Sequence, residues 1–201
     1  MNRRERRAAG KQGGHFGDDS TAGSHGAATD LFNAALRYQR SGRFAEAELL
    51  YGQVLAIDPG HARSLHLLGL IARQLGRHDA AIERITQAIA MNNRQPEFHH
   101  NLGNIRRETG RASEAVPGHQ RAFTLAPNLV ETRNNLAATL QDLGRLDQAI
   151  SHYQQALALG PDNAEIHNNL GTALQSKPRL YRDDSCILAL EEFSVRMARQ
   201  G

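Results

Sequence analysis

The chain has 201 residues, of which 40% are hydrophobic, with one Cys, no Trp and few aromatic side chains. A core of this composition must rely on Ala, Leu and Ile, which suits close-packed helices. The single cysteine excludes a disulfide framework, and the formal charge of +3 gives little support to nucleic-acid binding. Because no apolar run approaches the roughly 18 residues that cross a bilayer, we expect no membrane span and a reducing, cytoplasmic location.

Residues 1–27 combine an Arg-rich start with Gly, Ser, His and Asp and have almost no large apolar side chain. Such a composition cannot bury enough apolar surface to fold, so we expect a disordered, basic and Gly-rich leader. A signal peptide would need an apolar segment after its positive start, and none follows. The Arg cluster is most simply solvated, and the alternative is contact with RNA or an acidic surface.

A Gly-Arg dipeptide then recurs every 34 residues, beginning at Gly42, Gly76, Gly110 and Gly144. An Ala lies five residues after each Gly, in the same register. A fixed spacing held four times indicates an internal repeat. We therefore divide the array 28–177 into four repeats and a half, with the bounds 28–61, 62–95, 96–129, 130–163 and 164–177.

Each repeat shows the pattern of two helices joined by the Gly-Arg turn. In the first repeat, Leu31, Ala35 and Tyr38 follow the spacing of one helix face. Gly42 is predicted to end that helix, because Gly readily takes the left-handed conformation of a C-terminal cap. A second apolar stripe follows and ends before Pro59, so the repeat predicts a helical hairpin.

Two places break the pattern. Pro117 and Gly118 fall inside the second helix of the third repeat, where Pro removes a backbone hydrogen bond at a cost of about 3 kcal/mol. We expect a kink or a frayed first turn there. In the fifth unit, Pro178 stands where the next Gly is due, so we expect the repeat plan to end and residues 178–201 to form an atypical tail. A capping helix is predicted from about Ser185.

The period of 34 residues, Leu-Gly in the first helix, Ala near the start of the second and Pro at the end resemble the tetratricopeptide repeat family. In the third repeat these residues are Leu102, Gly103, Ala115 and Pro127. The resemblance covers about residues 28–177. It implies an all-α solenoid of helical hairpins, a right-handed superhelix whose concave wall is lined by the first helix of each repeat and holds a peptide or a partner protein.

Residues 99–103, 133–137 and 167–171 resemble more narrowly the repeats that precede the catalytic region of O-linked N-acetylglucosamine transferases and their bacterial SPINDLY-like relatives. In that family an asparagine ladder holds the backbone of the protein substrate. By position the ladder maps to Asn33, Asn101, Asn135 and Asn169, with Leu67 as the missing rung. The glycosyltransferase domains that should follow are absent, which indicates a truncated or shifted relative, or a separated repeat region with a possible partner glycosyltransferase domain.

Four asparagines in phase require a reason, because the Asn amide competes for backbone groups inside a helix. An amide is donor and acceptor together and can pair with one peptide unit, so the functional interpretation is a ligand-binding ladder. The alternative is that these side chains only join adjacent helices, or were copied when the repeats duplicated. Secondary candidates near the same wall are Asn104, Asn134, Asn168 and His100.

Nothing in the sequence indicates catalysis or a cofactor. The ten histidines include no HExxH or paired His/Cys spacing, so we predict no metal site. There is no phosphate-binding Gly loop and no nucleophile elbow. The sequence thus predicts a non-enzymatic scaffold that binds a protein or peptide in its concave groove. The alternative is the substrate-recruiting repeat region of an O-GlcNAc-transferase-like glycosyltransferase that lacks its catalytic domain.

Overall fold

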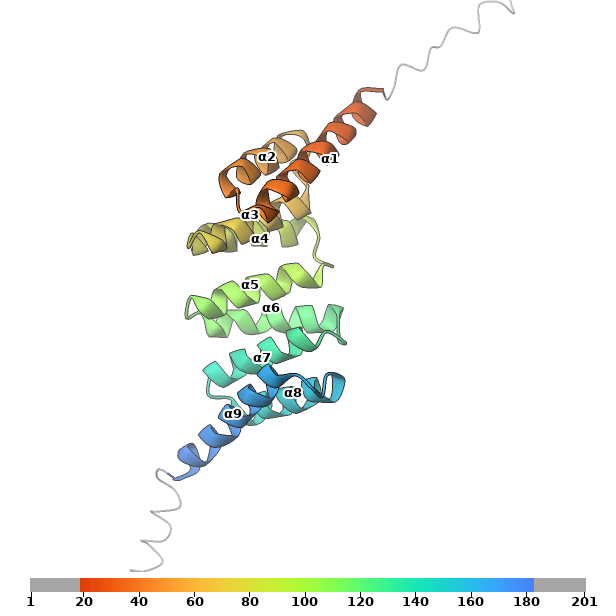
Figure 1. The fold of residues 1–201 in the computed structure, drawn as a ribbon. Helices are drawn as coiled ribbons and strands as arrows, with labels where there is room; N and C mark the ends of the chain where they lie inside the picture. Colours follow the sequence, from red (N-terminus) through yellow and green to blue (C-terminus); the bar gives the residue numbers. More distant parts are fainter. Residues whose placement is uncertain (1–18, 183–201) are drawn as a thin grey trace, which may run out of the picture. The chain divides into compact units, whose positions relative to one another are not determined.

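A computed structural model describes residues 19–182, and all regular structure in this range is helical (Figure 1). The predicted all-α fold is therefore confirmed. The capping helix predicted from about Ser185 lies outside the described residues. The helices are α1 (Asp19–Arg40), α2 (Phe44–Ile57), α3 (Ala62–Gln74), α4 (His78–Met91), α5 (Pro96–Glu108), α6 (Ala112–Leu125), α7 (Val130–Asp142), α8 (Leu146–Leu159) and α9 (Ala164–Arg182).

The chain divides into two units, residues 1–59 and 60–201. In the first unit, α1 packs against α2. Ala35 and Ala47 are both fully buried, and small side chains at these two positions let the helices approach closely. The phenol of Tyr51 donates a hydrogen bond of 2.7 Å to Oε1 of Gln39 and so ties α2 to α1.

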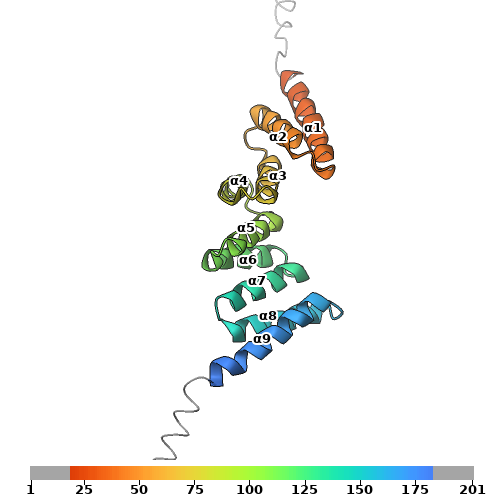
Figure 2. The same cartoon turned by 60° about the vertical axis from the view of Figure 1, so that its left-hand side comes forward.

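In the second unit, α3 packs on α4, α5 on α6, and α7 on α8, which gives three hairpins in sequence. The second helix of each hairpin also packs on the first helix of the next, so that α8 lies against α9 (Figure 2). We call α3, α5, α7 and α9 the A helices. Because α3 contacts α5, α5 contacts α7, and α7 contacts α9, the A helices form one continuous wall. This stacking is a solenoid.

The Gly of each Gly-Arg turn takes the left-handed conformation, with φ between 71° and 76°. The backbone N–H of the following Arg bonds to a carbonyl in the last turn of the helix, at 2.8 Å from Arg77 to Ala72 and 2.7 Å from Arg111 to Arg106. This is the geometry in which a left-handed residue ends a helix and satisfies its free carbonyls. The predicted glycine caps are confirmed.

The first helix begins earlier than the sequence indicates. It starts at Asp19, so residues 19–27 are helical and the predicted bounds of the disordered leader, 1–27, are wrong at this end. The buried side chains of Ala28, Phe32 and Ala35 anchor the helix. Once a helix is nucleated, each further residue adds one hydrogen bond, so it extends into a segment with no apolar face of its own.

The first turn of α6 is intact, and the expected fraying is wrong. The N–H of Ala115 bonds to the carbonyl of Arg111 at 3.1 Å, and the helix continues through Pro117. Burial of Ala115 and Val116 holds this turn in place. The expected kink at Pro117 stays a prediction. Close packing against α5 explains why the neighbouring residue is Gly118, because a Cβ there would lie 3.0 Å from the carbonyl oxygen of His99.

The last described helix runs past the expected end of the repeats. Helices α3, α5 and α7 have 13 residues each, whereas α9 has 19 and continues through Pro178 to Arg182. No Gly stands at this point to take the left-handed conformation, so the backbone is not turned away from the helix axis. The boundary placed between residues 177 and 178 therefore does not end the helix.

Gly103 and Gly171 occupy the same position in their repeats but have different surroundings. A Cβ on Gly103 would lie 2.6 Å from Cε1 of the buried His119, whereas a Cβ on Gly171 meets nothing within 4 Å. We expect Gly103→Ala to lower the free energy of unfolding by about 1–3 kcal/mol through overpacking. Gly171→Ala should raise it by up to about 1 kcal/mol through helix propensity. Urea unfolding measures both, and equal effects would contradict this packing.

Candidate functional site

The predicted site residues lie on the first helices of the hairpins. His100, Asn101 and Asn104 are on α5, Asn134 and Asn135 are on α7, and Asn168 and Asn169 are on α9. Asn33 is an exposed residue of α1 in the first unit and is considered separately from the others. The other candidate residues therefore lie together on the wall of A helices in the second unit.

Three ladder amides bond to the preceding A helix. Asn101 donates from Nδ2 to Nε2 of His66 at 2.9 Å, and Asn135 donates from Nδ2 to Nε2 of His100 at 3.4 Å. Asn169 donates from Nδ2 to Oδ1 of Asn134 at 3.2 Å. In each case the partner lies 35 residues earlier in the sequence. We call this row of six side chains the polar seam.

The polar seam follows from the repeat length. A partner 35 residues earlier stands one residue before the equivalent ladder position of the preceding repeat, on the neighbouring A helix. The amide nitrogens therefore join adjacent helices, which is one of the two interpretations that the sequence left open. Each amide also has an oxygen, which is a separate acceptor that these bonds do not use. The ligand-binding role of the ladder stays a prediction.

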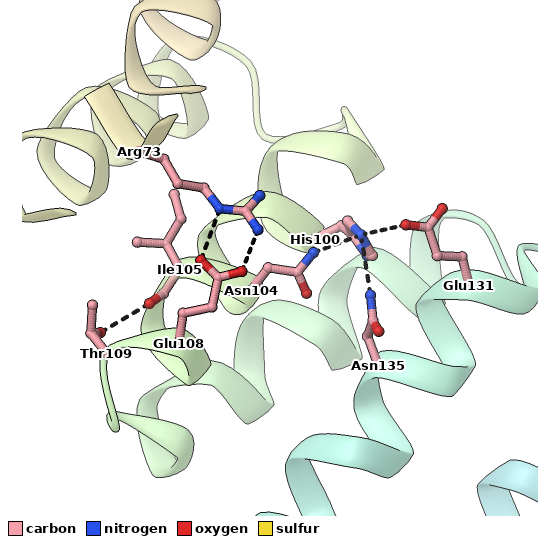
Figure 3. A network of polar contacts seen from close by, with 8 residues as sticks. All are labelled: Arg73, His100, Asn104, Ile105, Glu108, Thr109, Glu131 and Asn135. Atoms are coloured by element: carbon pink, nitrogen blue, oxygen red, sulfur yellow. Dashed lines mark hydrogen bonds and ion pairs between the residues drawn. The ribbon is translucent and has the colours of Figure 1, made fainter. Parts of the chain in front are cut away.

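His100 connects three side chains through one ring nitrogen (Figure 3). Its Nε2 lies 3.0 Å from Nδ2 of Asn104 and 3.4 Å from Nδ2 of Asn135, and 3.3 Å from Oε1 of Glu131. Burial lowers the pKa of His100, although the nearby Glu131 acts in the opposite direction. In the tautomer with the proton on Nδ1, Nε2 accepts from the amides and orients Asn104 and Asn135. In the tautomer with the proton on Nε2, the ring donates to Glu131 instead.

Two further histidines are buried in neutral form. Burial, with Arg63 nearby, lowers the pKa of His66 to about 4. Burial, with His100 and Arg107 nearby, lowers the pKa of His119 to about 3. His119 is fully buried and neither ring nitrogen has a partner among the described residues. Its ring lies edge-on to His100, with 5.8 Å between the centroids.

Ion pairs join neighbouring A helices near their C-terminal ends. Sequence analysis did not predict them. Nε of Arg73 lies 2.8 Å from Oε2 of Glu108, and Nε of Arg107 lies 2.6 Å from Oδ2 of Asp142 (Figure 3 shows the first pair). Both pairs again span 35 residues. The sequence signal was available, since an Arg and an acid recur at this interval in consecutive repeats.

A polar hollow of about 180 Å³ opens between α7 and α9. It contains three of the predicted site residues, Asn134, Asn135 and Asn169, so the structure brings these together. Tyr153 of α8 reaches the same hollow and donates to Oε1 of Gln141 at 3.0 Å, and burial raises its pKa to about 12. The other lining residues are Arg107, Ala138, Gln141, Asp142 and Glu165.

A second hollow, of about 430 Å³, lies between α3 and α5. Leu67 lies here at the position that Asn occupies in the following repeats. The imidazole of His66 and the ring of Phe98 meet in this hollow, with 4.5 Å between their centroids. The other lining residues are Ala62, Arg63, Asn92, Gln95 and Glu97. Sequence analysis noted Leu67 only as a missing rung and did not predict a hollow.

The described helices show neither a metal site nor a membrane span. Among residues 19–182, no three His, Cys, Asp or Glu side chains come together in a way that could hold a metal ion. In the same range, no helix has the length and apolar character to cross a bilayer.

Family models match two parts of the chain. A tetratricopeptide repeat model matches residues 38–105 and a TPR repeat model matches residues 139–177. Residues 38–105 and 139–177 therefore carry tetratricopeptide repeats (TPRs). No curated protein sequence matches the chain.

Several solved structures share this fold. The structure of MamA 41-end from Desulfovibrio magneticus RS-1 has a TM-score of 0.71 at 19% identity, covering 86% of this chain and 94% of that chain. YrrB, described as a TPR protein with an unusual peptide-binding site, has a TM-score of 0.68 at 22% identity, covering 76% of this chain and 78% of YrrB. The first TPR of Spaghetti (RPAP3), bound to an HSP90 peptide, has a TM-score of 0.57 at 22% identity, covering 58% and 93%.

The buried histidines predict a loss of stability in acid. The pKa of His119, about 3, and that of His66, about 4, lie below the value of about 6.5 for an unfolded imidazole. Below a pH of about 6.5 the unfolded state therefore binds more protons than the folded state. Each of these histidines then lowers the free energy of unfolding by up to about 1.4 kcal/mol for every unit by which the pH falls. His119→Ile should reduce this loss, since Ile85 fills the equivalent place against Gly69. Urea unfolding of the wild type and of His119→Ile at pH 7 and pH 5 measures this loss of stability. An equal loss in the two proteins would contradict the burial of a neutral His119.

Proposed function

We propose that this TPR protein binds a segment of another protein in extended conformation along the wall of A helices. The observation that supports this most is the polar hollow between α7 and α9, which Asn134, Asn135 and Asn169 line together. An extended segment presents a backbone donor and a backbone acceptor at every residue. Amide side chains supply both kinds of group, and so do the Gln and Tyr side chains of the same hollow.

The groups on this wall are held in place before any ligand arrives. His100 bonds to two amides, and Asn134 donates from Nδ2 to Oε1 of Glu165 at 3.1 Å. Side chains that are already ordered lose less entropy when a ligand binds. YrrB and the RPAP3 repeat, whose titles name a peptide-binding site and a bound peptide, support a peptide as the ligand class. We further propose that the chain is a cytoplasmic scaffold without a reaction of its own.

A second candidate is the substrate-recruiting repeat region of an O-GlcNAc-transferase-like glycosyltransferase. The observation that favours it is the recurrence of Asn101, Asn135 and Asn169 at intervals of 34 residues. In that role the ladder amides would contact the substrate backbone. Their nitrogens are engaged with the preceding A helix here, so only the amide oxygens and the neighbouring side chains remain for that contact. Peptide binding by a scaffold therefore has the stronger support.

Selection from a phage-displayed library of random peptides tests the proposed function. We expect the full chain to enrich peptides, and the variant Asn135→Ala/Asn169→Ala to bind them at least about tenfold more weakly, since two amides in the hollow are lost. The matched control is Asn93→Ala/Asn128→Ala, which removes two exposed loop amides away from the hollow. Circular dichroism shows that each variant is folded. Equal affinity in both variants would contradict the proposal.

A further inference from the structure

We propose that the hollow between α3 and α5 is an apolar anchor subsite, which takes one aliphatic or aromatic side chain of the bound segment. The inference rests on the proposed function and adds to it the type of residue that is recognised and where it binds. The hollow of about 430 Å³ falls within the size range of ligand pockets in proteins, about 300–1,000 Å³. It can therefore hold a large side chain together with part of its backbone.

The lining of this hollow includes an apolar part beside its polar residues. Leu67 and Ala62 contribute aliphatic surface from α3, and Phe98 contributes an aromatic ring from α5. The imidazole of His66 lies against Phe98 at an interplanar angle of 32° and presents ring surface as well. His66 stays neutral at physiological pH because burial lowers its pKa to about 4. An apolar side chain would thus meet neutral ring and aliphatic groups.

The repeat register shows that this chemistry is specific to one place on the wall. Asn101, Asn135 and Asn169 occupy the position of Leu67 in the later repeats, and each donates a hydrogen bond to the preceding A helix. Leu67 has no amide to donate. The hollow between α7 and α9, which includes Asn135 and Asn169, is lined almost entirely by polar groups. One wall therefore offers an apolar subsite near its start and a polar subsite near its end.

The charges at the mouth of the hollow favour an uncharged occupant. Arg63 on α3 and Glu97 on α5 both line the hollow and are exposed, and their charges are opposite. A charged side chain that entered between them would be attracted by one and repelled by the other, and would lose water against the apolar part of the lining. An aliphatic or aromatic side chain has no such cost, and it gains from removal of its surface from water.

The distance between the two subsites sets the length of the segment. Packed helices lie about 8–10 Å apart, and two such steps separate the α3–α5 hollow from the α7–α9 hollow, so the subsites are about 20 Å apart. An extended chain advances about 3.3 Å per residue. The apolar residue should therefore lie about six residues from the part of the ligand that contacts Asn135 and Asn169.

The substitution Leu67→Asn tests the anchor, because it places at this position the residue that the four other repeats already accommodate. The matched control is Leu174→Asn, which changes an exposed Leu of α9 that does not line the hollow. Peptides enriched from the phage-displayed library by the wild-type chain are the probes. Each is also made with its apolar residue replaced by Asn, and affinities are measured by fluorescence anisotropy.

We expect wild-type selections to converge on an apolar residue at one position. Leu67→Asn should weaken binding of these peptides about tenfold or more and have little effect on peptides that already carry Asn there, whereas Leu174→Asn should change neither. If peptides are enriched but no apolar position recurs, or if Leu67→Asn binds them as the wild type does, the anchor is wrong and the proposed function stands. If no peptide is enriched, both are wrong.

Discussion

The left-handed glycine after each described hairpin's first helix fixes where the next helix begins. With φ near 75° the chain reverses within three residues, and the second helix starts at the same point of every repeat. Because the turns have one length, each repeat has 34 residues and places equivalent side chains on neighbouring A helices of the second unit. The polar seam and the two ion pairs, which all span 35 residues, depend on this constancy.

The same register makes the wall both stable and suited to binding. A helical hairpin cannot bury its apolar face alone, so neighbouring repeats must stack, and the stacking leaves the A helices as a surface. The seam satisfies polar groups that the stacking removes from water, which would otherwise cost about 1–3 kcal/mol each. It also orients His100, Asn134 and their partners. Under the proposed function, binding groups and structural groups are neighbours in the same row, and Asn135 has both roles.

Much of the fold could be predicted because its signals are local. Gly42, Gly76 and their equivalents predict the turns, and Pro96 begins α5 at a position where a missing N–H costs nothing. The ends of the array could not be predicted in the same way. The start of α1 depends on how far a nucleated helix extends, and the continuation of α9 depends on the absence of a turn residue.

The candidate site was predicted only in part, since its contacts are not local. The phase of the asparagines placed Asn135 and Asn169 on one wall, but their partners become visible only when facing helices are compared. The burial of His119 depends on the missing side chain of Gly103, on another helix. The hollow beside Leu67 likewise depends on Phe98 of the next A helix, and no local pattern connects these two positions.

The central claim is that the A helices of the second unit are the ligand-binding surface. Chemical-shift mapping of the full chain with a peptide from the library selection tests it most directly, since each Asn side-chain amide has its own signal. We expect the largest shifts at Leu67, Asn101, Asn135 and Asn169. Shifts confined to α4, α6 and α8, with the asparagine amides unmoved, would show that the ligand binds the opposite face and would contradict the account.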